Sequence, residues 1–315
     1  MNLKSLIRHE TLLAILLVVV LAILSFQSDR FFTVDNLLNQ GRLMTEIGLI
    51  AIAMTFVIAT GGIDLSVGSI LGLTAILTGV FWQNVGLPLP VAATAAIAAG
   101  TFAGFVNGVI ITRFRVPPLI ATLATLALYR GLAEGISQAR SVRGYPEWFY
   151  VLGQKDVLGV PTQLWILLFA AVVASIILAY TTWGRTVYAV GSNEVASRFS
   201  GLSVEKTKLA LYTASGFAAA LAAVIFVSRV STTRSDMGTG IELDAITAVV
   251  LGGTSIFGGR GTVVGTIIGL CLIQALKNGL SLAGVKGDGT IMLIGAVLIL
   301  AILASNLFER SGTRT

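Results

Sequence analysis

Residues 181–209 read TTWGRTVYAVGSNEVASRFSGLSVEKTKL and separate two strongly apolar runs of the chain. This central loop carries Arg185, Arg198, Lys206 and Lys208 against only two glutamates. Loops on the cytoplasmic side of a membrane collect lysine and arginine close to the ends of the spans. The stretch therefore indicates a membrane protein whose central loop faces the cytoplasm and offers a surface to a soluble partner.

The composition agrees with a membrane protein. The 315 residues are 55% hydrophobic and 11% charged, whereas a soluble domain carries about 25% charged residues. The mean hydropathy is +0.90. A membrane core about 30 Å thick requires about 20 apolar residues for each helix. We therefore expect an all-α integral membrane protein of about ten transmembrane helices (eight to ten) in a single domain over residues 1–315.

The apolar runs give the expected spans. They are residues 12–24, 43–60, the run that resumes after Ser69 and reaches Trp82, and residues 91–112, 117–137, 164–180, 209–230, 243–257, 262–282 and 290–307. Residues 243–257 are weakly apolar and either cross or re-enter. Arg42 and Glu46, four residues apart at the edge of the second span, are expected to pair.

An even number of spans puts both termini on one side of the membrane. The basic central loop assigns that side to the cytoplasm, although basic residues divide almost evenly between the two sides. Residues 139–162 then form a periplasmic loop. Its aromatic residues are typical of a membrane-interface belt, and the loop is also long enough to receive a soluble delivery protein.

The charged and reactive residues exclude several functions. The formal charge is +6, but the basic residues are scattered between apolar runs, which indicates lipid contact and orientation rather than nucleic-acid binding. With one histidine and the single cysteine Cys271, a metal site, a disulfide and a Cys/His nucleophile are not expected. No G-x-x-x-x-G-K-[ST] phosphate loop occurs. We expect no enzymatic activity and no cofactor in this chain.

The apolar pattern breaks at residues 61–69, which read GGIDLSVGS. The adjacent Gly61 and Gly62 favour a break in the helix, and Asp64 and Ser66 are suited to cap the helix that follows. Broken helices persist at membrane depth only where protein or a watery cavity covers the backbone. Two interpretations follow: a gate or path element near Asp64, or a tight, capped turn between two spans.

Two glycine stripes predict close helix packing. Gly100, Gly104 and Gly108 recur every four residues, with Asn107 beside them, and Gly261, Gly265 and Gly269 repeat the spacing. Small residues at this spacing let helix backbones approach closely in lipid. Gly-Gly pairs precede the two stripes, at 61–62 and 252–253. These repeats indicate two weakly related halves.

A polar stripe is predicted on one face of a late span. Gln274, Lys277, Asn278 and Ser281 occupy positions i, i+3, i+4 and i+7. The stripe either lines a path or extends Lys277 outward to the membrane surface. A neutral, hydroxyl-rich substrate needs hydrogen-bonding groups without a deep binding well, and Asn107, Gln274 and Asn278 suit it by type.

Three stretches resemble the signature stretches of a known family. They are residues 61–69, residues 183–194 continuing to Ser200-Gly201, and residues 248–261, which read AVVLGGTSIFGGRG. In this order they are similar to bacterial sugar ABC-importer permeases of the ribose, xylose, arabinose, rhamnose and autoinducer-2 type, over nearly the whole chain. The resemblance implies a type II ABC-importer-like, inner-membrane permease that pairs as a dimer with an ATP-binding cassette subunit inside and a periplasmic sugar-binding protein outside.

The resemblance also implies a coupling loop at residues 183–208, in which a short helix within 193–201 sits in a groove of the ATPase. The residues assigned to it are Arg185, Asn193, Glu194, Ala196, Arg198 and Gly201. Where the family commonly has Glu-Ala-Ala, this chain has Glu194-Val195-Ala196. The residues themselves support such a helix: Ser192 or Asn193 is suited to be the N-cap, and Gly201 to end it.

The sequence thus predicts a permease subunit that imports a monosaccharide (a pentose, a hexose or a deoxyhexose, with rhamnose slightly favoured) by alternating access. ATP and Mg²⁺ would be bound by the separate ATPase. The alternatives are an ion-gradient-driven secondary sugar transporter, for which Asp64 is the main candidate coupling residue, and a channel or structural membrane subunit. The sequence leaves open whether the chain pairs with a second copy of itself or with a sister permease. Membrane lipid surrounds the pair in both cases.

Overall fold

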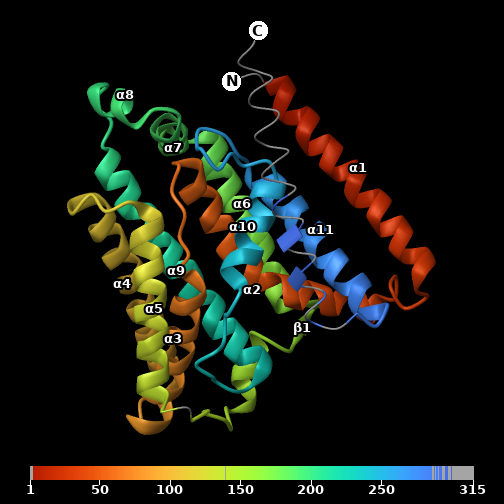
Figure 1. The fold of residues 1–315 in the computed structure, drawn as a ribbon. Coiled ribbons are helices and arrows are strands. Elements are labelled where there is room, and N and C mark those ends of the chain that lie inside the picture. Colours follow the sequence, from red (N-terminus) through yellow and green to blue (C-terminus); the bar gives the residue numbers. More distant parts are fainter. Residues whose placement is uncertain are drawn as a thin grey trace.

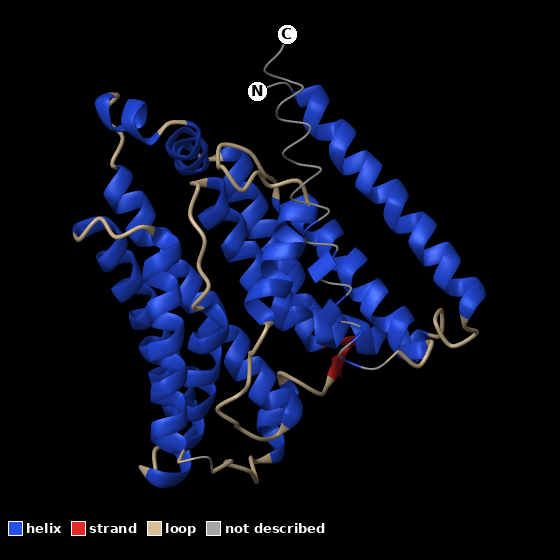
Figure 2. Cartoon of the chain, in the orientation of Figure 1, coloured by secondary structure: helices blue, strands red, loops and turns tan. Residues whose placement is uncertain are grey.

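The computed structural model describes residues 3–138 and 140–285, together with residues 287, 289, 291, 292, 295, 296 and 299. Figure 2 shows that this part of the chain is nearly all helix. Among the described residues, eight helices are long and apolar enough to cross a membrane, so the prediction of an all-α membrane protein is confirmed. They belong to α1 (Leu3–Gln27), α2 (Val34–Ala59), α3 (Val67–Gly79) with its π-helical extension η1 (Val80–Asn84), α4 (Leu89–Arg113), α5 (Pro118–Ser137), α6 (Thr162–Tyr180), α9 (Val204–Val230) and α11 (Val263–Leu282).

Shorter elements lie at the two ends of the bundle. Helices α7 (Thr182–Ser192) and α8 (Glu194–Phe199) lie together at one end, which we call the α8 end (Figure 1). The opposite end carries the 3-10 helix η2 (Glu147–Val151) and the antiparallel strands β1 (Asp156–Val157) and β2 (Val160–Pro161). Helix α1 begins at the α8 end. The predicted central and 139–162 loops therefore lie at opposite ends of the bundle.

One expected span is only half a span. Helix α10 (Ile241–Leu251) has 11 residues, about 16 Å of helix at 1.5 Å per residue, against a membrane core of about 30 Å. The following residues, 252–262, form an irregular loop at the α8 end. Of the two options for residues 243–257, the structure therefore favours a segment that enters without crossing as a helix. The run 290–307 lies outside the continuously described residues.

The break at residues 61–69 places non-helical backbone inside the bundle. Residues 60–66 leave the end of α2 at the α8 end and pass into the bundle before α3 begins (the orange segment in Figure 1). Helix α3 then has only 13 residues before η1 extends it. The crossing that follows α2 therefore begins with non-helical backbone at residues 60–66 before the helix of α3 and η1 starts, and we call such a crossing interrupted.

Helices α3 and α10 begin side by side and run in opposite directions. Helix α3 runs away from the α8 end and α10 runs toward it (Figure 1). Their starts meet so closely that a Cβ added to Gly68 would overlap both the Glu242 carboxyl group of α10 and the Gly238 carbonyl oxygen just before it. Residues 62–66 (GIDLS) before α3 and residues 240–244 (GIELD) at the start of α10 have similar sequences. This similarity supports two related halves better than the Gly-Gly pairs do, because it lies at matching helix starts.

The first glycine stripe lies where α4 crosses α9. A Cβ added to Gly216 would lie 2.7 Å from Gly104 Cα, and one added to Gly108 would lie 2.8 Å from a Leu209 methyl carbon. A Cβ on Gly100 would overlap the Thr74 hydroxyl. The missing side chains let these two backbones come into contact.

The second glycine stripe belongs only in part to a helix. Gly265 and Gly269 of α11 pack directly against the α10 backbone. Gly261 lies in the loop before α11, with a φ of +152°. Its prediction as a helix-packing residue is therefore wrong, because Thr262 is the N-cap and the helix begins after it.

The predicted Arg42–Glu46 pair is also wrong. Arg42 binds Asp156 of β1 at 2.6 Å, and Glu46 binds Arg229 of α9 at 2.8 Å. Glu46 is only 2% exposed and faces the bundle, whereas Arg42 lies at its edge. Each charge pairs with a residue more than a hundred positions away, which helix spacing alone does not predict.

Candidate functional site

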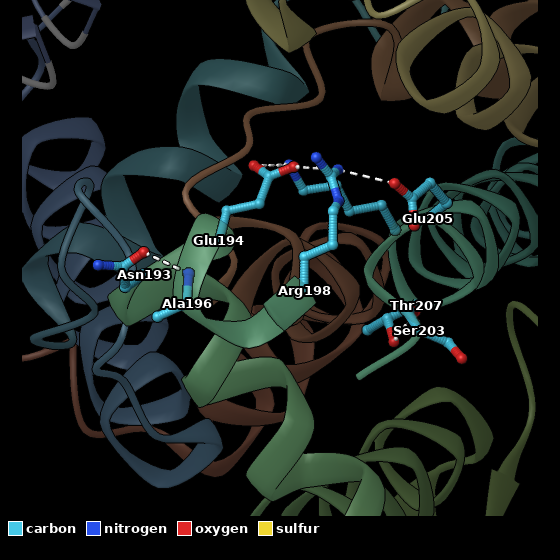
Figure 3. Close-up of polar contacts among 8 residues, drawn as sticks. Asn193, Glu194, Ala196, Arg198, Ser203, Glu205 and Thr207 are labelled. Carbon is cyan, nitrogen blue, oxygen red and sulfur yellow. Dashed lines mark hydrogen bonds and ion pairs between the residues drawn. The ribbon is translucent and has the colours of Figure 1, made fainter. Parts of the chain in front are cut away.

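The loop at the α8 end forms two short helices whose caps come from their own residues. The Asn193 side chain accepts a hydrogen bond from the Ala196 amide at 2.8 Å, so Asn193, rather than Ser192, is the N-cap of α8 (Figure 3). Gly201 follows the last turn with a φ of +81°, a conformation that favours glycine. Arg185 lies exposed on α7. The sequence therefore builds a defined helix at the place where the docking helix is predicted.

Ion pairs hold α8 against the start of α9. Glu194 binds Lys208 at 2.6 Å and Arg198 at 3.3 Å, and Arg198 also binds Glu205 at 2.7 Å. Figure 3 shows Arg198 between the two glutamates. Only 14% of the Lys208 side chain is exposed, whereas the side chains of Glu194, Arg198 and Glu205 are about half exposed. Because a single exposed pair contributes at most about 1 kcal/mol, α8 is positioned by the connected set.

The surface of the α8 end carries exposed apolar side chains. On α8, Phe199 is 89% exposed and Val195 is 61% exposed, and on the nearby turn between α4 and α5, Phe114 is 71% exposed. A cavity of about 270 Å³ separates that turn from α8 and is lined by residues of both, among them Arg115 and Glu194. Exposed apolar side chains on a charged surface are typical of a protein-docking site.

The three signature stretches meet at the α8 end. A Cβ added to Gly258 would lie 2.8 Å from both the Gly61 amide nitrogen and the Gly191 carbonyl oxygen. The Gly259 amide donates a 2.9 Å hydrogen bond to the Ala59 carbonyl oxygen at the end of α2. The loop of residues 252–262 thus contacts both α7 and the segment that begins at Gly61.

Tyr188 fixes α7 to the loop before α11. Its hydroxyl donates a 2.6 Å hydrogen bond to the Gly261 carbonyl oxygen. Burial, and then the charge of Glu10, raise the pKa of Tyr188 to about 12, so the phenol stays protonated and remains a donor at neutral pH.

Asp64 is the centre of a buried polar cluster. Its Oδ1 accepts hydrogen bonds from the Ser66 amide at 3.0 Å and the Ser66 hydroxyl at 2.6 Å, and its Oδ2 accepts one from the Ser215 hydroxyl at 2.8 Å. Asn107 donates to the Ser66 hydroxyl at 2.7 Å, and Tyr129 donates to Asn107 at 3.2 Å. Asp64 is fully buried.

Three hydroxyl and amide donors, rather than a cation, satisfy this carboxylate. Within the described part of the chain, Asp64 forms no ion pair with lysine or arginine. Gly61 turns the chain at a φ of +77°, and a Cβ on Gly62 would lie 2.5 Å from the Tyr212 hydroxyl. Gly61 is therefore favoured by the path of the backbone, and Gly62 by the Tyr212 side chain packed against it.

The remaining path candidates, Gln274 and Asn278, lie toward the opposite end. Gln274 donates to Gln40 at 2.7 Å, and Asn278 exchanges hydrogen bonds of 2.9 and 3.0 Å with Asn36. Lys277 binds Asp244 at 2.6 Å, so it pairs within the bundle. The structure therefore places the path candidates in two separate clusters, one around Asp64 and one between α2 and α11.

Sequence reasoning missed Ser215, Tyr129 and Tyr212, which surround the Asp64 segment. They lie singly in apolar helices and match no motif. The available signal was helix spacing: Ser215 follows Lys208 by seven residues, so both lie on one face of α9.

A bundle of helices able to cross a membrane, with non-helical backbone inside it and short capped helices at one end, is typical of membrane transport proteins. Residues 36–302 match the family described as "Branched-chain amino acid transport system / permease component". The chain belongs to this family of permease components.

Curated relatives match over nearly the full length of both chains. The ribose import permease protein RbsC of Escherichia coli K12 is 42% identical over 310 residues, 96% of this chain and 94% of the relative. RbsC of Bacillus subtilis strain 168 is 40% identical over 91% of this chain and 89% of the relative. The autoinducer 2 import system permease protein LsrD of Escherichia coli O9:H4 is 37% identical over 95% and 92%. No solved structure gives a significant match.

These comparisons confirm the resemblance to the sugar ABC-importer permeases that the three stretches indicated. Because the relatives are permease components, the chain is a transport subunit rather than an enzyme. It is a multi-pass protein of the bacterial inner membrane.

Proposed function

We propose that this chain is the transmembrane permease subunit of an ATP-driven importer of a monosaccharide. The observation that carries the proposal is the α8 end: a capped helix, fixed to α9 by ion pairs, presents Val195 and Phe199 to solvent at the place where all three signature stretches meet. A soluble motor that binds α8 there would act directly on the ends of the interrupted crossings.

The partners follow from this role. An ATP-binding cassette subunit, which holds ATP and Mg²⁺, docks on α7, α8 and the turn after α8, through Arg185, Asn193, Glu194, Ala196, Arg198 and Gly201. A periplasmic sugar-binding protein delivers substrate to the opposite end, where residues 139–162 lie. A second permease copy or a sister permease completes the membrane part, surrounded by lipid.

The orientation follows from the docking site. If the ATPase binds α8, the α8 end is cytoplasmic, and α1 begins on that side. We propose that both termini are cytoplasmic.

The proposed substrate is a pentose, a hexose or a deoxyhexose. The relatives are named for ribose and for autoinducer 2, so these two compounds are to be tested before rhamnose. The path candidates around Asp64, among them Ser66 and Asn107, would offer hydroxyl and amide groups to such a substrate.

The test is gentle detergent purification of the tagged chain from its native membrane, with identification and ATPase assay of the proteins that elute with it. We expect a stoichiometric ATPase that is lost when residues 193–201 are deleted, and ATP-dependent uptake of ribose, autoinducer 2 or rhamnose in proteoliposomes. Elution of the chain alone, with uptake that survives ATP depletion and depends on pH or sodium, would establish the gradient-driven transporter instead.

A further inference from the structure

The docking helix and the interrupted crossing are joined by one continuous helix. Helix α9 has 27 residues without a break, about 40 Å of helix at 1.5 Å per residue. It runs from the α8 end to the opposite end of the bundle (Figure 1). Two side chains on one face of α9 contact these two regions: Lys208 binds Glu194 of α8, and Ser215 binds Asp64.

The first contact makes α8 and the start of α9 move together. The Lys208 amine is mostly buried and lies 2.6 Å from Glu194, and Arg198 adds a second connection to Glu205. A partner that displaces α8 therefore displaces the first turns of α9.

The crossing with α4 restricts how α9 can respond. At Gly104 and Gly216 the two backbones touch, so α9 cannot move toward α4. Rotation about its axis and sliding along the crossing remain open to it. Both motions change the position of Ser215, the neighbour of Gly216, relative to the segment that holds Asp64.

The second contact transfers that displacement to the interrupted crossing. The Ser215 hydroxyl is the donor to Asp64 Oδ2, at a carboxylate that is fully buried. Breaking this bond leaves a polar oxygen without a partner in a buried site, which costs more than loss of a bond at the surface. Residues 62–66 therefore follow Ser215 when α9 moves.

Other bonds keep the segment from moving freely. Asn107 of α4 donates to Ser66 at 2.7 Å, and Thr122 of α5 donates to the Ile63 carbonyl oxygen at 3.3 Å. The backbone at residues 60–66 is not helical, so it can change conformation without breaking a helix. Because of these contacts, residues 60–66 are not loosely mobile and change position only when a neighbouring helix is displaced.

We propose that Ser215 and Asp64 form the joint through which displacement of the docking helix α8 reaches the interrupted crossing at residues 60–66. Ser215 is a positioning residue: it acts on the transport path through Asp64. The proposal rests on the proposed function, because it requires an ATPase on α8.

The experiment compares Ser215→Ala with Ser228→Ala in proteoliposomes that contain the chain with its copurifying ATP-binding and substrate-binding subunits. Ser228 is a matched control, since it is also a fully buried serine of α9 and donates a 2.6 Å hydrogen bond, but to Phe149. Ribose uptake and ATP hydrolysis are measured together. We expect Ser215→Ala to lower uptake per ATP hydrolysed by about tenfold, the effect of losing a buried hydrogen bond at the upper end of the usual range.

Ser228→Ala is expected to leave the ratio of uptake to ATP hydrolysis unchanged, and Ser215→Thr, which keeps the hydroxyl, to restore most of it. If Ser215→Ala does not assemble, Ser215→Cys gives the same comparison with a weaker donor. Equal ratios for the Ser215 and Ser228 variants would overturn the joint while leaving the importer intact. Uptake without ATP dependence in the unmodified protein would overturn the proposed function itself.

Discussion

Glu46 on α2 and Arg229 on α9 form a 2.8 Å ion pair inside the bundle, with Glu46 only 2% exposed. Arg229 also lies over the Phe226 ring, 4.8 Å from its centre. One Glu46 oxygen, Oε2, has no hydrogen-bond partner within the described part of the chain. The pair joins the first half of the chain to the second, so its charge balance should matter to the stability of the whole bundle.

Replacing one member alone should be costly. Arg229→Met leaves a buried carboxylate without its cation, and removal of one partner of a buried pair typically costs about 3–5 kcal/mol. We expect a large fall in melting temperature in detergent. The double variant Glu46→Gln/Arg229→Met should recover much of the loss, because no unpaired charge remains.

Arg42 provides the matched control. Its pair with Asp156 is partly exposed, at 27% and 38%, and such pairs contribute about 0–1 kcal/mol. Arg42→Met should therefore shift the melting temperature only slightly. Equal shifts for Arg42→Met and Arg229→Met would show that the Glu46 pair is not effectively buried.

Lys208 should be required for binding of the ATPase rather than for insertion. Lys208→Met removes the connection between Glu194 and α9, and we expect the amount of ATPase that copurifies to fall about two- to fivefold, in line with an ion pair worth up to about 1 kcal/mol. Insertion and yield should not change. Pull-down of the ATPase at several concentrations measures the effect.

Lys206 lies exposed on the same turn of α9, so Lys206→Met controls for loss of a positive charge near the docking site. Lys208→Arg should retain most of the binding. A Lys206 variant that loses as much ATPase as the Lys208 variant would show that general positive charge, not the Glu194 contact, controls docking.

The sequence predicted the parts of this fold that depend on local pattern. Apolar runs predicted most of the spans, glycine spacing predicted close packing of α4 against another helix, and the short helix α8 was predicted with Ser192 or Asn193 as its N-cap and Gly201 at its end. Each depends on residues within a few turns of one another. Such patterns are visible in one chain because hydrophobicity, backbone conformation and capping act locally.

The pairing of charges and of buried polar groups could not be predicted in the same way. Glu46 lies one helical turn from Arg42 but binds Arg229, and the donor to Asp64 Oδ2 is Ser215, 151 residues away. These contacts depend on which helices pack together. The apolar pattern also allows two options for residues 243–257, because the apolar run continues past the end of α10 into Gly252 and the irregular loop.

Gly104 should tolerate no side chain. A Cβ at this position would overlap the Tyr212 carbonyl oxygen and lie 2.8 Å from Gly216 Cα. Because both neighbours are backbone atoms, Gly104→Ala should force α4 and α9 apart and destabilise the protein by about 1–3 kcal/mol, as overpacking does. Unfolding in mixed detergent micelles measures this change.

Gly131 of α5 has no atom within 4 Å of an added Cβ. Gly131→Ala is therefore the control, and it should be neutral or stabilising by about 0.5–1 kcal/mol, since alanine favours helix more than glycine does. If both alanine variants had the same stability, the close crossing of α4 and α9 would be wrong.

Asn278 distinguishes a structural role of the polar stripe from a role in the path. Its amide exchanges two hydrogen bonds with Asn36, and Gln274 is bound to Gln40. Because these amides satisfy one another, we expect Asn278→Ala to lower stability and to leave the apparent affinity for transported sugar unchanged. A double-mutant cycle with Asn36→Ala should give a coupling energy of about 0.6 kcal/mol or more, the average for hydrogen bonds between membrane helices.

The cycle requires unfolding measurements on Asn36→Ala, Asn278→Ala and the double variant, and uptake at several sugar concentrations for each. Additive losses of stability together with a raised KM for Asn278→Ala would assign the stripe to the path. A coupled loss with an unchanged KM would assign it to the joint between α2 and α11. In that case the groups that contact sugar are to be sought around Asp64, Ser66 and Asn107, where the crossing is interrupted and the backbone is free of helical bonds.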